Sequence, residues 1–336
     1  MTSRPAPRPR AAPGCRIPSF AKVNLGLEVL GTREDGYHEL RTLFQTIDLH
    51  DDIVLRPRPK GITVHCDHPG VPLDDTNLAV RAARDLARYG RIDRGVEIRI
   101  TKRIPVAGGL GGGSSNAAAV LMALDRIWGL GLGPAGLHPL ARRLGADVPF
   151  FLVGGTALGL ARGDEVYALH RQVRAHVVLV DPGMPVSTAA VFRRIDAYLT
   201  PRENSHTIFR FVSRDLEGGR VFAVLANDLE KAALEEAPGL SEQVQRIRGV
   251  LVQEGAALSA LSGSGSSFFG IFEDARRARR AQAALVCGGF GALCTRTLTL
   301  DQYRAVWARS LDGVGARTRP GKEPTPWRSR TSRLSR

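Results

Sequence analysis

Residues 105–116 read PVAGGLGGGSSN, with glycine at five of the six positions from 108 to 113. An alternating run at 95–101 precedes this stretch, and an alanine- and leucine-rich run at 117–128 follows it. These patterns predict a strand, a glycine loop and a helix, in that order. The loop is not a Walker A motif, because no lysine follows its last glycine, and it does not match the GxGxxG pattern.

The glycine loop has the chemistry of a phosphate cradle. Backbone without Cβ atoms can approach an anion closely. Ser114, Ser115 and Asn116 then open a helix whose free N–H groups and dipole favour negative charge. A flexible surface turn is the alternative, but it does not explain so many glycines between a regular strand and a regular helix.

The residues before the loop predict a mostly extended chain. Apolar and polar side chains alternate over 20–30, so this stretch is expected to be a strand on which Lys22 and Asn24 point the same way. The other predicted elements are an extended stretch through Ile47, strands at 52–56 and 61–66, and a helix capped by Asp75 or Thr76 that runs to about Tyr89.

The residues after the loop predict a second unit. A helix near 134–144 and strands to about Leu169 complete the first unit, and the pattern restarts at His176. From there the predicted order of strand, helices, two strands, helix and strand is close to a ferredoxin-like split βαβ arrangement. We expect an α+β protein with units at 15–170 and 171–312.

The charge of the chain is concentrated at its ends. Its 336 residues include 47 Lys and Arg against 33 Asp and Glu, which gives a net charge of +14. The segments 1–14 and 313–336 are rich in Pro, Arg, Ser and Thr, so we expect two disordered basic tails. They are interpreted as solvated extensions, with contact to polyanions as the alternative.

The sequence indicates a cytoplasmic, soluble protein. No apolar run approaches the roughly 18 residues of a membrane-spanning helix, and the start of the chain lacks the apolar stretch of a secretory signal. The cysteines are too far apart for a CxxC motif, so we expect reduced thiols at Cys15, Cys66, Cys287 and Cys294.

Three motifs resemble those of the GHMP small-molecule kinases, which act on galactose, homoserine, mevalonate and phosphomevalonate. They are the stretch 105–118, the segment Pro18-Ser-Phe-Ala-Lys-Val-Asn-Leu and the segment Leu261-Ser-Gly-Ser-Gly-Ser266. Their order along the chain is that of the family. The resemblance spans about 17–307 and implies an N-terminal domain like the second domain of ribosomal protein S5 and a ferredoxin-like C-terminal domain.

Two further segments narrow the resemblance. Arg33-Glu-Asp-Gly-Tyr-His-Glu-Leu40 and Gly145-Ala-Asp-Val-Pro-Phe-Phe151 are similar to the branch of the family that phosphorylates a diphosphocytidyl derivative of methylerythritol. The implied activity is ATP-dependent phosphorylation of the substrate's 2-hydroxyl group in non-mevalonate isoprenoid synthesis. Another family member acting on homoserine or mevalonate, and a basic nucleic-acid-binding protein, are the alternatives.

The resemblance also implies the catalytic pair. Asp147 would accept the hydroxyl proton, and Lys22 would keep that carboxylate ionised and polarise the hydroxyl. Asn24 would bind substrate beside them. Without the resemblance, Asp147 would be interpreted as a helix cap and Lys22 as a solvated lysine on a strand.

The ligand-binding residues follow from the same resemblance. We expect ATP with Mg²⁺, the ion held mostly by ATP and water rather than by a dedicated protein metal site. The expected ATP-binding residues are Asn77, Lys102, Pro105, Gly108, Gly109, Leu110, Gly111, Gly112, Gly113, Ser114 and Ser115. The expected substrate-binding residues are Asn24, Tyr37, His38, Thr188, Phe192, Gly263 and Ser264, with Tyr37 and Phe192 stacking on cytosine.

Two other signals receive a plain structural interpretation. The segment His65-Cys66-Asp67-His68 carries metal-type side chains, but strand alternation would send successive ones to opposite faces. The arginines at 276–280 would spread over the solvent side of a helix. We expect no membrane partner, no nucleic-acid partner, and a monomer or a homodimer.

Overall fold

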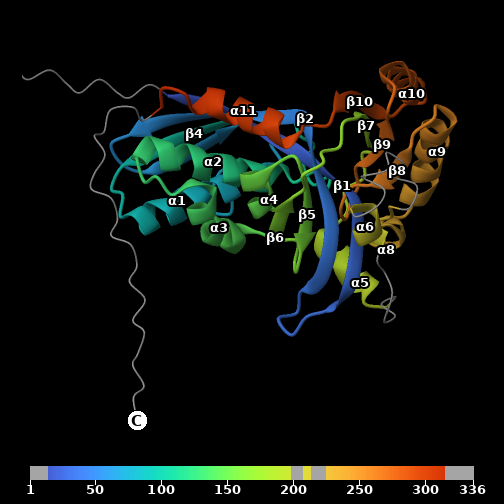
Figure 1. Ribbon diagram of the computed structural model, residues 1–336, viewed down its shortest axis with the longest axis horizontal. Helices are drawn as coiled ribbons and strands as arrows, with labels where there is room; N and C mark the ends of the chain where they lie inside the picture. Colours follow the sequence, from blue (N-terminus) through green and yellow to red (C-terminus); the bar gives the residue numbers. More distant parts are fainter. Residues whose placement is uncertain (1–13, 198–206, 213–224, 315–336) are drawn as a thin grey trace, which may run out of the picture.

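The computed structural model describes residues 14–197, 207–212 and 225–314 (Figure 1). Nearly all of the two expected tails, 1–14 and 313–336, lies outside the described residues. The described chain forms two sheets, each with its own helices, and the second sheet lies beside one end of the first.

The first sheet has the order β3-β4-β2-β5-β6, and β1 pairs with β2. Its strands are β1 (Cys15–Thr32), β2 (His38–Arg58), β3 (Ile62–Cys66), β4 (Gly95–Thr101), β5 (Thr156–Leu160) and β6 (Glu165–Ala168). The extended stretch through Ile47 and the strand at 52–56, predicted separately, form the single strand β2. Together with β1 it makes a long antiparallel hairpin that reaches well beyond the rest of the sheet (Figure 1).

Four helices cover one face of this sheet (Figure 1). They are α1 (Leu78–Gly90), α2 (Gly112–Trp128), α3 (Gly133–Leu144) and α4 (Val148–Val153). The alanine-rich face of α2 is fully buried, because small side chains let a helix approach its neighbours closely.

Two predicted helix boundaries were wrong. Helix α1 is capped by Asn77 and not by Asp75 or Thr76. Helix α2 begins at Gly112, inside the glycine loop and before Ser114, which was expected to open it.

The second sheet has the order β10-β7-β9-β8, which is the ferredoxin-like arrangement. Its elements are β7 (His176–Asp181), α5 (Thr188–Ile195), α6 (Thr207–Arg210), α8 (Leu229–Glu236), α9 (Leu240–Gln253), β8 (Leu258–Leu261), β9 (Phe268–Phe272), α10 (Ala275–Cys287) and β10 (Gly291–Arg296). Part of the predicted helical region 220–254 lies outside the described residues.

Apolar side chains of both sheets meet in a shared core. Val23 and Leu25 of β1 pack there with Leu179 of β7 and Phe269 of β9, all of them fully or almost fully buried. The last helix, α11 (Leu300–Leu311), returns to the first core. We propose a boundary between Ala168 and His176, with α11 assigned to the first unit although it lies within the expected range 171–312.

Candidate active site

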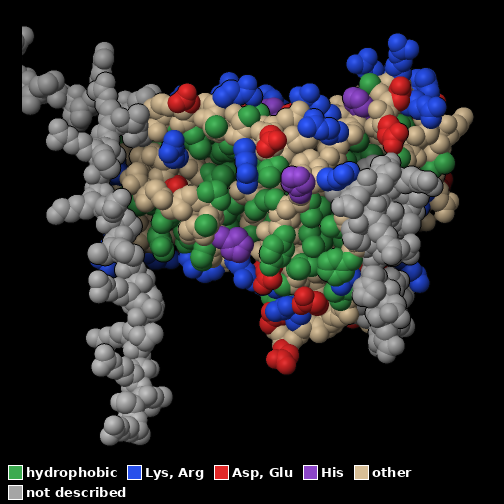
Figure 2. Space-filling view, viewed as in Figure 1, with side chains coloured by type: hydrophobic (Ala, Val, Ile, Leu, Met, Phe, Trp, Pro, Cys, Tyr) green, Lys and Arg blue, Asp and Glu red, His purple; other side chains and the backbone are tan. Residues whose placement is uncertain are grey.

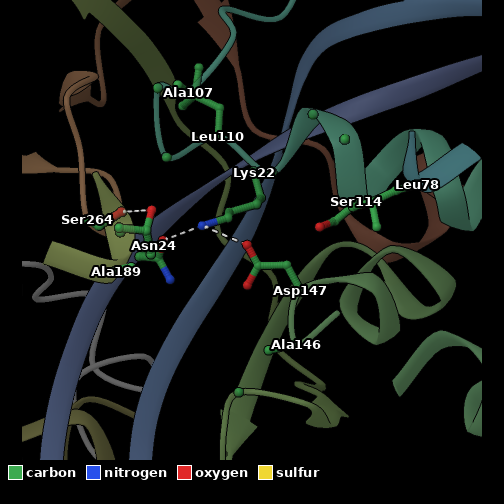
Figure 3. A pocket seen from close by; sticks show the side chains of 18 of the residues that line it. Lys22, Asn24, Leu78, Ala107, Leu110, Ser114, Ala146, Asp147, Ala189 and Ser264 are labelled. Carbon is green, nitrogen blue, oxygen red and sulfur yellow. Dashed lines mark hydrogen bonds and ion pairs between the residues drawn. The ribbon is translucent and has the colours of Figure 1, made fainter. Parts of the chain in front are cut away.

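Lys22 stands at the centre of the site. Its backbone N–H donates to the carbonyl of Leu110 in the glycine loop over 3.0 Å. Its ammonium group lies 3.4 Å from Asp147 Oδ2 and donates to Asn24 Oδ1 over 2.7 Å (Figure 3). The Lys22 side chain is only 4% exposed and that of Asp147 is 35% exposed, so the carboxylate is the open member of the pair. As the strand pattern predicted, Lys22 and Asn24 point the same way.

A hydrogen bond to Thr42 of β2 fixes the orientation of the Asn24 side-chain amide. Its Nδ2 donates to Thr42 Oγ1 over 2.8 Å, and that hydroxyl donates to the carbonyl of Gly26 over 2.9 Å. Because the amide nitrogen is engaged by β2, Asn24 Oδ1 is turned towards Lys22. Thr42 has no sequence signal of its own, because its contact with Asn24 depends on how β1 and β2 pair.

Asp147 stands at the N-cap position of α4, but its side chain does not cap the helix. The residue has helical backbone angles, and its side chain makes no capping hydrogen bond. The helix cap was the alternative interpretation of this residue, and the structure excludes it. The carboxylate is therefore available to the cavity and to Lys22.

The glycine loop and the C-terminal glycine motif contact each other. Ser262 Oγ donates to the carbonyl of Gly109 over 3.1 Å, and the backbone N–H of Ser267 donates to the carbonyl of Gly108 over 3.2 Å. Gly109 has φ of 72°, and a Cβ there would lie 2.0 Å from the carbonyl oxygen of Ser262. Only glycine fits at this approach of the two domains.

One cavity of about 950 Å³ joins these features, and every predicted site residue except Ser115 lines it. Figure 3 shows Lys22, Asn24, Ser114 and Asp147 converging on it from β1, α2 and the start of α4. Ser115 was predicted to bind ATP, but it is 2% exposed and its Oγ accepts a hydrogen bond from Ser19 Oγ. Being on the inner side of α2, it faces the sheet and not the cavity.

Two predicted nucleotide contacts already have protein partners. Asn77 Oδ1 accepts from the N–H of Ala79, and its Nδ2 donates to the carbonyl of Pro72. The ammonium of Lys102 is paired with Asp51 over 2.8 Å. Both residues still line the cavity.

The other end of the cavity is aromatic. His38 packs against Phe192 with ring centroids 5.0 Å apart, and its Nε2 lies 2.7 Å from Asp196 Oδ1. Tyr37 is 55% exposed, and the guanidinium of Arg162 lies 4.8 Å from its ring centroid. A flat base could be received between such rings.

Arg162 and Asp196 line this end but were missed by sequence reasoning. Arg162 is held by Asp164, whose carboxylate is completely buried. Burial raises the pKa of Asp164, but hydrogen bonds from Arg162 and Arg142 outweigh this and leave that pKa below its ordinary value. Arg162 lies on a loop, where no local sequence pattern predicts that its guanidinium will contact the Tyr37 ring.

Thr188 and Ser264 complete the aromatic end on the side of the second domain, where their hydroxyl oxygens lie 2.7 Å apart. They link the start of α5 to the C-terminal glycine motif. Among the residues that the structure describes, there is no group of three or more His, Cys, Asp or Glu side chains placed to hold a metal ion. In the same residues, no helix has both the length and the apolar character that crossing a membrane requires.

Comparisons with known proteins match both halves of the chain. The family model of the GHMP kinases N terminal domain matches residues 77–155, and that of the GHMP kinases C terminal matches residues 220–290. The first match contains the glycine loop and Asp147, and the second contains the C-terminal glycine motif.

Relatives that match over most of their length are also kinases. A 4-diphosphocytidyl-2-C-methyl-D-erythritol kinase of Chlorobium luteolum is 39% identical over 80% of this chain and 92% of its own length. The kinase of the same name from Geobacter metallireducens is 43% identical over 79% of this chain and 92% of its own length.

Solved structures show the same relationship. The crystal structure of a 4-(cytidine 5'-diphospho)-2C-methyl-D-erythritol kinase superposes with a TM-score of 0.69 at 37% identity, covering 84% of this chain and 98% of that one. Homoserine kinase from Cytophaga hutchinsonii also superposes with a TM-score of 0.69, covering 88% of this chain and 98% of that one. At 19% identity, the second likeness shows the fold alone.

Proposed function

Because this chain belongs to the 4-diphosphocytidyl-2-C-methyl-D-erythritol kinases of the GHMP kinase family, we propose that its cavity performs their reaction. The protein transfers the γ-phosphoryl group of ATP to the 2-hydroxyl of 4-diphosphocytidyl-2-C-methyl-D-erythritol, in the methylerythritol phosphate pathway to isoprenoids. The observation that carries the assignment is the contact of Lys22 with Asp147 in the cavity that the glycine loop lines.

The roles of the two charged residues follow from their geometry. Phosphoryl transfer needs mainly positioning and charge stabilisation, with one group to take the hydroxyl proton. Asp147 is the more open member of the pair and accepts that proton as the hydroxyl oxygen bonds to the γ-phosphorus. The bond between that phosphorus and the β,γ-bridging oxygen breaks, and ADP leaves with this oxygen. Lys22, buried and held by Asn24, supplies positive charge beside the reacting oxygens.

The two ligands approach from different sides. ATP lies along the glycine loop, where N–H groups at the start of α2 face its phosphates. The cytosine lies at the aromatic end, near Tyr37, His38 and Phe192. In this proposal the methylerythritol part lies between them, beside Asn24 and Asp147.

Mg²⁺ is part of this proposal, and the residues fit it. Ser114 lines the cavity at the start of α2, and a hydroxyl oxygen is a ligand of the kind that Mg²⁺ accepts. ATP phosphates and water would supply the remaining ligands. When bound, the ion would neutralise charge on the β- and γ-phosphates.

The cellular setting is proposed on chemical grounds. ATP is a cytoplasmic reactant, and the four cysteines are unpaired, which is typical of a reducing compartment. We therefore propose a cytoplasmic enzyme. A monomer or a homodimer remains our prediction.

The test is ADP release, measured with a coupled assay, from diphosphocytidyl-methylerythritol, homoserine and mevalonate offered separately. We expect turnover with the first substrate alone. Turnover only with homoserine or mevalonate would overturn the substrate assignment. RNA binding that survives removal of both basic tails, without ADP release, would favour the nucleic-acid alternative.

A further inference from the structure

A buried carboxylate, Asp51 of β2, lies next to the glycine loop and does not line the cavity. It is completely inaccessible to solvent. A buried charge is retained at a cost unless partners surround it, so its partners show what it does.

The first set of partners lies just before the glycine loop. Asp51 Oδ1 accepts from the backbone N–H groups of Arg103 and Ile104, both over 2.8 Å. Asp51 Oδ2 accepts from Lys102 Nζ over 2.8 Å, and the same ammonium donates to the carbonyl of Ile104 over 2.5 Å. Asp51 therefore fixes the backbone that leads into Pro105.

The second set of partners lies at the far end of the loop. The side-chain amide of Asn116 is oriented by its neighbours so that its nitrogen faces Asp51 Oδ2 at 3.0 Å and the carbonyl of Gly112 at 3.1 Å. Lys102 Nζ also lies under this end, 3.0 Å from where a Cβ on Gly112 would stand. One carboxylate thus reaches both ends of the loop, directly at Ile104 and through Asn116 at Gly112.

We propose that Asp51 is a positioning residue for nucleotide binding, which sets the spacing between the two ends of the glycine loop. The inference rests on the proposed function, in which that loop holds the ATP phosphates. Backbone N–H groups stabilise phosphate best when they are aimed before the ligand arrives. Asp51 maintains this aim from inside the protein without touching ATP.

The test compares Asp51→Asn with a matched variant, Asp125→Asn. Asp125 is also buried, sits near the other end of α2, and accepts backbone N–H groups of Leu132 and Gly133 over 2.9 and 3.0 Å. Calorimetry on the full chain would measure binding of a non-hydrolysable ATP analogue and, separately, of diphosphocytidyl-methylerythritol. Thermal melting would report stability.

Both substitutions should lower the melting temperature, because each removes a charged acceptor from buried N–H groups. Asp51→Asn should also weaken the ATP analogue at least about ten-fold, since an amide there turns an acceptor into a donor facing Lys102 and Asn116. Its binding of the diphosphocytidyl substrate should stay within about two-fold of the unaltered protein. Asp125→Asn should keep both affinities.

A milder variant covers the case in which Asp51→Asn does not fold. Asn116→Ala removes the amide that joins Asp51 to Gly112, together with its hydrogen bond to Ser19. It leaves the contacts of Asp51 with residues 102–104 in place, and it should weaken the ATP analogue about three-fold or more. If Asp51→Asn binds the analogue as tightly as Asp125→Asn does, the positioning role alone is overturned. Where Asp51→Asn does not fold, equally tight binding by Asn116→Ala overturns it. Failure of the folded, unaltered protein to bind the analogue would overturn the proposed function and this inference together.

Discussion

At the scale of single residues, the site depends on unequal burial of two opposite charges. Lys22 is enclosed by β1, Asn24 and the glycine loop, whereas Asp147 opens to the cavity. These contacts hold the Lys22 ammonium group in one position. Because that group is buried, water and salt screen its charge only weakly. The carboxylate beside it can meet a substrate hydroxyl.

This asymmetry predicts the behaviour of Asp147→Asn. The amide keeps the shape of the carboxylate but cannot accept the hydroxyl proton, so kcat should fall by about 10²–10⁴. ATP affinity should stay near that of the unaltered protein, because the glycine loop is unchanged. Steady-state kinetics and calorimetry measure the two quantities. Near-normal turnover would remove Asp147 from the mechanism, and an equal loss of ATP affinity would place it in nucleotide binding.

Sequence patterns could identify individual residues only where spacing carries the information. The alternation of β1 placed Lys22 and Asn24 on one face, and the structure confirms this. The same alternation could not show that Ser115 faces Ser19, because the inner and outer sides of α2 are set by packing on the sheet. Nor could it place Arg162 over Tyr37, a contact made by two loops.

At the scale of elements, the contact between the two glycine motifs is the most constrained feature. Gly108 and Gly109 accept hydrogen bonds from residues of the other domain, so the phosphate loop is part of the seam between domains. The order of strand, loop and helix around it was predicted correctly, although α2 begins inside the loop. That the loop touches Ser262 was not predictable, since the two segments are separated by about half the chain.

Gly109→Ala should damage both stability and activity. A methyl group there would strike the carbonyl of Ser262, and φ of 72° disfavours any side chain. We expect a loss of about 1–3 kcal/mol in the free energy of unfolding and a rise in KM for ATP. Urea denaturation and steady-state kinetics measure these effects.

Gly249→Ala is the matched control for that change. Gly249 lies within α9, and a Cβ there meets no atom within 4 Å. It should be neutral or stabilising by up to about 1 kcal/mol, because alanine favours the helix. If the two variants behaved alike, the close approach of the two glycine motifs would not be real.

At the scale of the whole molecule, the two domains share more than a linker. The core between the sheets combines β1 of the first with β7 and β9 of the second. Helix α11 then carries the chain back to the first domain, where the Tyr303 hydroxyl donates to the carbonyl of Phe151 over 2.5 Å. Burial raises the pKa of Tyr303 far above its ordinary value, which keeps this donor protonated. The sequence indicated two units, but no local pattern revealed this return.

The shared core predicts that both domains unfold together. Two of the three tryptophans, Trp128 and Trp307, lie in the first core, and Trp327 lies outside the described residues. With Trp327 replaced by phenylalanine, tryptophan fluorescence reports on the first domain. Phe269 belongs to the second sheet, and Phe269→Ala should cost about 3–5 kcal/mol by opening a cavity between the sheets. If the domains are coupled, this substitution lowers the urea midpoint measured by fluorescence as much as the midpoint measured by far-ultraviolet circular dichroism.

Val286→Ala, at a half-exposed position on α10, is the control and should leave both midpoints nearly unchanged. A fluorescence midpoint that did not move with Phe269→Ala, beside a circular dichroism curve in two steps, would show that the domains unfold independently.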